Sequence, residues 1–275
     1  MLMAKFEFSL DNCLEFLGYC LSVANNNNKP YLSYFGFLPG IKDKTEQILK
    51  SQGINDWYDF INSNSVNGIG KARKSYYDRV IMRTLREIKA ENIAYISETF
   101  PEKEHWRFYP LFKDETVFLD IETTGITRNS EIFMIGMYDG YDTKIMLKYF
   151  NLDFDKLVKF TRNFKMIVTF NGSSFDIPFL KSKITNFPKL LHVDVKHLCH
   201  KLGLKGGLKE IEKRLGIKRN PILDKLCGGD VYRLYRMYLA SGDEYYLNLL
   251  IEYNEDDCIN LKTILDKVFG ILIKE

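Results

Sequence analysis

The sequence predicts an α/β fold, in which a mixed sheet with flanking helices is preceded by a small all-helical domain. After residue 114, short β-branched and aromatic stretches alternate with helical periodicity, as in layered α/β proteins. The amino-acid composition changes around residues 100–113, where two prolines lie among charged residues of both signs and aromatic residues. The length of 275 residues also suits two domains, since one domain takes roughly 100–200 residues. We therefore expect a helical region at 1–100, a linker at 101–113 and a second domain at 114–275.

The first hundred residues are predicted to be helical. Leucines recur at helical spacing over residues 10–23, which predicts an amphipathic helix, and the asparagine run at 25–28 predicts a loop. Two short glycine-containing turns, at 38–42 and 66–71, each precede a helical stretch. The helix expected over 71–93 is strongly basic.

The second domain alternates between the two kinds of element. We expect strands at 116–121, 132–137, 144–150, 166–170 and 190–195. We expect helices at 154–163, 206–215, 229–240 and 246–269.

The composition, 45% hydrophobic and 27% charged, is that of an ordinary globular protein and excludes a collagen-like, low-complexity or disordered chain. Lys and Arg (39) nearly balance Asp and Glu (36), so the net charge of +3 indicates no partner. Five cysteines without a C-x-x-C pair imply neither a disulfide framework nor a cysteine zinc site, which fits a reducing compartment. No apolar run approaches the ~20 residues of a membrane helix. We therefore predict a cytoplasmic protein with no membrane partner.

Acidic residues near the ends of several elements are the strongest chemical signal. Asp120 and Glu122 are two apart on an apolar strand, so both project from one face, where like charges repel unless a cation compensates. Asp176 follows a Gly/Ser turn at the start of a helix; an ordinary N-cap is the alternative for this residue alone. Tyr253 and Asp257 are four apart on the last helix and share a face. Carboxylates suit hard divalent cations, and two such ions promote in-line phosphoryl displacement.

The order Asp-x-Glu, Asn-x-x-x-Phe-Asp and Tyr-x-x-x-Asp resembles the three motifs of the DEDD 3′–5′ exonucleases, in the subgroup with tyrosine in the third motif. Over residues 115–270 the chain is most similar to the YprB-like ribonuclease-H-like family, and it resembles the proofreading domain of family B DNA polymerases. This resemblance implies a ribonuclease-H-like mixed sheet and a two-metal-ion site. The ions would be Mg²⁺ or Mn²⁺, held by Asp120, Glu122, Asp176 and Asp257.

The resemblance also implies roles for the neighbouring residues. Tyr253 would position the attacking water; a phenol with a pKa near 10 is a poor base at neutral pH. Thr123 and Gly125 would contact the terminal nucleotide, and Asn171 would line the cleft. The predicted function is a metal-dependent 3′–5′ exonuclease acting on a single strand or 3′ end of DNA or RNA. A non-catalytic nucleic-acid-binding module and a structure-specific endonuclease of the same fold are the alternatives.

Two further segments have open interpretations. Asp194 lies among three histidines, but their spacing fits no standard zinc site, and a supporting role beside the acidic residues is the alternative. The segment 196–225 carries nine basic residues, which form either a wall facing phosphate or a solvated helix face.

The turn at 66–71 resembles the hairpin of a helix-hairpin-helix motif. Glycines let backbone N–H groups approach a phosphate, and the following helix offers its positive N-terminus to the same anion. Nearby basic side chains add attraction that is independent of sequence. The residues expected to bind nucleic acid here are Gly68, Gly70, Lys71, Arg73 and Lys74. The turn at 38–42 is interpreted as a degenerate second copy that serves packing, and a plain helix–helix turn is the alternative for the motif.

Overall fold

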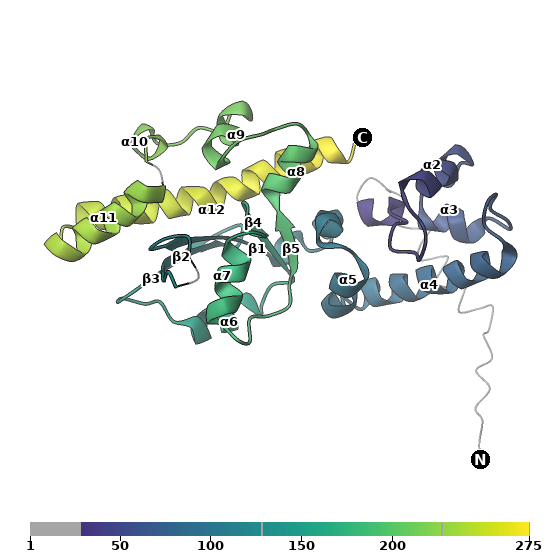
Figure 1. The fold of residues 1–275 in the computed structure, drawn as a ribbon, viewed down its shortest axis with the longest axis horizontal. Coiled ribbons are helices and arrows are strands. Elements are labelled where there is room, and N and C mark those ends of the chain that lie inside the picture. Colours follow the sequence, from purple (N-terminus) through teal and green to yellow (C-terminus); the bar gives the residue numbers. More distant parts are fainter. Residues whose placement is uncertain (1–28, 128, 227, 275) are drawn as a thin grey trace, which may run out of the picture.

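The chain folds into a mixed five-stranded sheet with helices on both faces and a helical region beside one sheet edge (Figure 1). This computed structural model describes residues 29–127, 129–226 and 228–274. The helix expected at 10–23 and the loop at 25–28 lie outside the described residues.

The sheet has the order β3-β2-β1-β4-β5. Its strands are β1 (Thr116–Thr123), β2 (Ile132–Tyr138), β3 (Thr143–Leu147), β4 (Met166–Thr169) and β5 (Leu191–Asp194). β1 is antiparallel to β2 and parallel to β4, so it forms the centre of the sheet. All five expected strands are present. The third ends at Leu147, three residues early, because the chain turns sharply at Tyr149, whose φ is 69°.

The alternation along β1 divides the protein into two layers. Leu119 and Ile121 face a core that includes Leu157 of α6 (Phe154–Thr161) and Leu180 of α7 (Asp176–Lys183). Phe118 belongs to the core on the opposite face, which α12 (Glu244–Leu272) covers. The period-2 pattern of the strand therefore sends Asp120 and Glu122 toward α12.

The helices that follow β5 gather around α12 (Figure 1). They are α8 (Val195–Lys201), α9 (Leu208–Arg214), α10 (Pro221–Asp224) and α11 (Gly228–Ser241). The sequence prediction missed α8, because the apolar run of β5 continues into its first turn; the Asp194 side chain caps this helix by accepting a hydrogen bond from the Lys196 N–H. Within the part of the chain that the structure describes, no helix has both the length and the apolar character needed to cross a membrane.

The helical region is built around aromatic side chains. Its elements are η2 (Pro30–Ser33), α2 (Asp43–Ser51), α3 (Trp57–Asn62), α4 (Lys71–Lys89) and α5 (Ile93–Thr99). The helix expected at 71–93 is α4, which begins at the expected residue and ends four residues early, at Lys89; a turn at Glu91, which has a positive φ, separates it from α5. Trp57 and Phe60 are fully buried in this region.

The segment expected as a linker is packed rather than extended. It contains the 3₁₀ helix η3 (Glu102–Phe108), followed by η4 (Lys113–Glu115). Phe108 stacks on Tyr31 of the helical region, and Tyr109 packs edge-on against Phe269 of α12. One apolar cluster therefore runs from the helical region through this segment to the sheet. The division into domains stays a prediction.

We expect Phe108→Ala to lower the free energy of unfolding by about 3–5 kcal/mol, because it empties a fully buried site. Leu111→Ala is the control within the same segment; Leu111 is exposed, and its loss should change stability by less than about 0.5 kcal/mol. Denaturant unfolding curves would measure both. Equal, small effects would mean that this segment behaves as a linker in solution.

Candidate active site

Three carboxylates meet between the central strand and the last helix. Asp120 and Glu122 come from β1 and Asp257 from α12, and one carboxylate oxygen of each lies within 4.8 Å of the others. The two strand residues are partly buried and Asp257 is buried. A group of this kind, with oxygen ligands only, is able to hold hard metal ions.

Asp176 lies at the same end of β1. It is the first residue of α7, is almost fully buried, and its carboxylate accepts a hydrogen bond from the Ile121 N–H at 3.1 Å. Ile121 lies between Asp120 and Glu122 in the chain. The N-cap position of α7 belongs to Phe175, so Asp176 is not the ordinary cap that was the alternative for it.

Burial raises the pKa of each of these carboxyls, and neighbouring negative charges raise it further. Burial raises the pKa of Asp120 well above its usual range, and the charges of Asp257, Glu122 and Asp176 raise it further. Burial raises the pKa of Asp176 to about 7, and that of Asp257 to about 6 against the opposing charge of Arg219. Ionising all four groups at neutral pH therefore requires positive charge between them. Hard divalent cations fit these residues, because such an ion neutralises carboxylates and binds several carboxylate oxygens at once.

Asn254 holds Asp120 from the neighbouring helix. Its Nδ2 donates a hydrogen bond to Asp120 Oδ2 at 2.8 Å. Space for this contact comes from Gly136, which pairs with Asp120 in the sheet: a Cβ on Gly136 would lie 1.8 Å from Asn254 Oδ1. The sequence analysis missed Asn254, although it directly follows Tyr253.

Tyr253 is buried beside the acidic group. Burial raises the pKa of its hydroxyl above its ordinary value, and the charge of Asp257 raises it further, so the phenol keeps its proton at neutral pH. The Lys209 ammonium lies 4.9 Å from the centre of the tyrosine ring, and the Arg219 guanidinium carbon lies 5.9 Å from it. The group can donate a hydrogen bond but cannot act as a base.

Arg219 is the main site residue that the sequence analysis missed. Its side chain is 2% exposed and is held by both carboxylate oxygens of Glu212, at 2.5 and 2.6 Å. It also forms an ion pair with Asp257. The guanidinium therefore brings a buried positive charge directly to the acidic group, and Glu212 fixes its position.

The other basic residues of 196–225 have different roles. Lys209 donates to backbone carbonyls near the end of α10, including that of Leu223 at 2.6 Å. Lys213 and Arg214 form more exposed ion pairs with Asp224 and Glu210. Neither a phosphate-facing wall nor a solvated face describes the whole segment, because Arg219 is internal.

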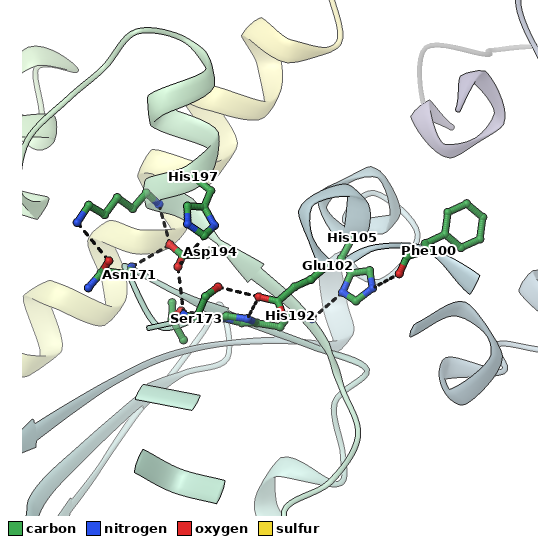
Figure 2. Close-up of polar contacts among 10 residues, drawn as sticks. Phe100, Glu102, His105, Asn171, Ser173, His192, Asp194 and His197 are labelled. Atoms are coloured by element: carbon green, nitrogen blue, oxygen red, sulfur yellow. Dashed lines mark hydrogen bonds and ion pairs between the residues drawn. The ribbon is translucent and has the colours of Figure 1, made fainter. Parts of the chain in front are cut away.

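Asp194 organises the loop that follows β4. The buried carboxylate accepts hydrogen bonds from the N–H groups of Asn171, Ser173 and Lys196, at 2.8, 3.1 and 3.1 Å (Figure 2). His197 Nδ1 lies 3.9 Å away, too far for a hydrogen bond. The supporting role considered for Asp194 therefore has a structural basis in this loop.

The same loop is tied to the segment before β1. Ser173 Oγ donates to Glu102 Oε1 at 2.7 Å, and His192 Nδ1 lies 2.8 Å from the same oxygen (Figure 2). Asn171 has a positive φ of 63°, and its Oδ1 accepts from the Lys196 ammonium. A network from η3 and β5 thus fixes the backbone that carries Asn171.

Thr123 and Gly125 form a turn at the end of β1. Thr123 Oγ1 donates to the Gly125 carbonyl at 2.7 Å, and a Cβ on Gly125 would lie 2.9 Å from the Ser130 hydroxyl oxygen. Their contact with a nucleotide stays a prediction.

The turn at 66–71 is a tight hairpin in front of α4. Gly68 has a φ of 84°, and Gly70 occupies the N-cap position. Lys71 and Arg73 are exposed, as phosphate binding requires. Lys74 differs from them, because it is buried and its ammonium pairs with Asp78 at 2.7 Å. The helical period places it on the inner face of α4.

The chain belongs to the RNase_H superfamily, because the sequence pattern of that family matches residues 117–269, more than half of the chain. The mixed sheet with flanking helices is the RNase H-like fold that the motifs predicted. No curated protein matches the chain. Among solved structures, the family B DNA polymerase from the hyperthermophilic archaeon Pyrobaculum calidifontis is similar, with 17% identity and a TM-score of 0.47. The alignment covers 58% of this chain and only 25% of the polymerase.

We expect Arg219→Gln to destabilise the fold by about 3–5 kcal/mol, because it leaves the carboxylates of Glu212 and Asp257 buried without their partner. The control is Arg214→Gln, which removes a more exposed ion pair and should cost no more than about 0.5 kcal/mol. Denaturant unfolding would compare the two. A loss for Arg219→Gln as small as that of the control would contradict the internal ion pair.

In EDTA, the free energy of unfolding should fall as the pH rises from about 5 to 7. Asp176 and Asp257 have folded-state pKa values of about 7 and about 6, whereas an unfolded Asp titrates near ~4. The folded state therefore binds more protons in this window, and it loses the resulting stability as the pH passes through the raised pKa values. Denaturant unfolding at pH 5, 6 and 7 would measure the slope.

The variant Asp176→Asn isolates the contribution of Asp176. Its free energy of unfolding should fall less steeply between pH 5 and 7 than that of the wild type. The comparison with this variant is needed because burial lowers the pKa of His105, and this shift makes the free energy of unfolding rise with pH instead of fall. Identical slopes for the wild type and Asp176→Asn would rule out the raised pKa of Asp176.

Proposed function

We propose that this protein is a metal-dependent 3′–5′ exonuclease that hydrolyses phosphodiester bonds of DNA or RNA by a two-metal-ion mechanism. One observation carries the proposal: Asp120, Glu122, Asp176 and Asp257, from three separate elements, gather at one end of the central strand. Membership of the RNase_H superfamily supports it.

The four carboxylates would hold two Mg²⁺ or Mn²⁺ ions. Bound there, the ions would supply activation of the attacking water and neutralisation of the charge on the leaving oxygen. Tyr253, which keeps its proton, would donate a hydrogen bond that orients the water. Asn254 keeps Asp120 in position, and Arg219 does the same for Asp257.

Further residues would hold the substrate. Thr123 and Gly125 would contact the terminal nucleotide, and Asn171, fixed by its turn, would line the cleft. The hairpin before α4, with Gly68, Gly70, Lys71 and Arg73, would attract nucleic acid through its backbone N–H groups and exposed cations.

The test uses purified protein with 3′- or 5′-labelled single-stranded DNA and RNA, in Mn²⁺ or EDTA. We expect a metal-dependent ladder that shortens from the 3′ end. Asp120→Asn should reduce the rate of cleavage by more than about a hundredfold, because mutation of residues that only support a metal ligand already lowers activity or metal affinity by about 10–100-fold. Glu252→Gln, an exposed carboxylate on the same helix as Asp257, should have no effect.

Two results would replace the proposal with one of its alternatives. Cleavage of a substrate whose 3′ end is blocked would indicate a structure-specific endonuclease. Intact substrate in every lane, with a gel shift still present, would indicate a non-catalytic binding module.

A further inference from the structure

An exposed aromatic patch lies where β3 ends. It consists of Tyr149 and Phe150, which are 73% and 57% exposed, with Lys148 and Tyr238 beside them. The Lys148 ammonium lies 4.9 Å from the centre of the Tyr149 ring, and the rings of Phe150 and Tyr238 of α11 are 5.6 Å apart. We call these four residues the stacking patch.

The backbone presents these rings in a fixed way. Tyr149 has a φ of 69°, in a left-handed region that bulky side chains rarely adopt. Asn151 holds the turn: its Oδ1 accepts from the Leu147 N–H at 2.7 Å, and its Nδ2 donates to the Ile145 carbonyl at 2.9 Å. A strained residue held this firmly, with its ring in solvent, is typical of a functional surface.

The stacking patch adjoins the acidic group. Glu122 pairs across the sheet with Met134, and Met134 pairs with Leu147, the residue just before the patch. Two strand spacings place Leu147 about 10 Å from Glu122 along the sheet.

The loop that follows Glu122 also reaches the patch. Glu131 binds Lys148 at 2.6 Å and accepts a backbone hydrogen bond from Thr124, next to the predicted nucleotide contacts.

We propose that the stacking patch binds unpaired bases of the strand whose 3′ end enters the acidic group. The proposal rests on the proposed function for the position of that end. Each ring offers a face on which a base can stack whatever its identity. The patch would therefore select single strands, because the bases of a duplex are already stacked on one another.

The test is fluorescence anisotropy with labelled 12-nucleotide dT and rU strands, with phosphorothioate 3′ linkages and Ca²⁺ in place of Mg²⁺ to prevent cleavage. Tyr149→Ala and Phe150→Ala should each weaken binding by about 5- to 150-fold, the loss of one stacked base. Tyr149→Trp should keep the affinity. Binding of a blunt duplex should not change in any variant.

The control is Tyr141→Ala. Tyr141 is 82% exposed, but it lies before the start of β3, at the opposite end of that strand from Tyr149. Equal affinities of Tyr149→Ala, Phe150→Ala and Tyr141→Ala for the single strands would overturn the proposal. So would a wild type that binds no strand.

An abasic site moved along the strand separates stacking from phosphate contact. At one or more positions in the strand, the abasic site should weaken binding to the wild type as much as Tyr149→Ala does, and it should not weaken binding to Tyr149→Ala further. If no abasic position changes the affinity of the wild type, base stacking is overturned. The binding and cleavage assays together separate the two proposals. If the Tyr149 and Phe150 variants bind single strands more weakly but the wild type cleaves no substrate, the stacking patch is retained and the nuclease proposal is rejected. If the wild type cleaves and these variants bind as tightly as the wild type, the nuclease proposal is retained and the stacking patch is rejected.

Discussion

Repulsion among four carboxylates at one end of a buried strand is the constraint around which this protein is arranged. Burial alone would drive Asp120 and Asp176 toward the neutral state, and each neighbouring negative charge adds to this effect. The fold answers with positive charge and hydrogen-bond donors from several elements. Arg219 reaches Asp257, the Asn254 amide reaches Asp120, and a backbone N–H of β1 reaches Asp176. The acidic group is also able to hold metal ions, which would balance the remaining charge.

The parts of this arrangement that depend on local periodicity could be predicted from the sequence. The two-residue period of a strand places Asp120 and Glu122 on one face, and the helical period places Tyr253 beside Asp257. The alternation of strands and helices likewise predicts the fold class, which the superfamily match and the sheet order confirm. The roles of these residues in catalysis stay predictions.

The parts that depend on contacts between distant segments could not be predicted. Arg219 looks like any other cation in a basic stretch, and only the folded chain shows that Glu212 and Asp257 enclose it. Glu102 belongs to a segment whose prolines and mixed charges indicate a linker, yet it binds Ser173 across the fold. Lys74 is the converse case: its position in a basic run predicts phosphate binding, whereas in the folded chain it is buried and pairs with Asp78.

Because Gly136 and Asn254 approach closely, substitutions at these two positions, which are far apart in the chain, depend on each other. Any side chain at 136 would strike the amide that holds Asp120, so a larger residue there requires a smaller one at 254. That smaller residue would no longer reach Asp120. Neither position can therefore drift alone, and among descendants of this sequence the pair should be inherited together or lost together with the acidic group.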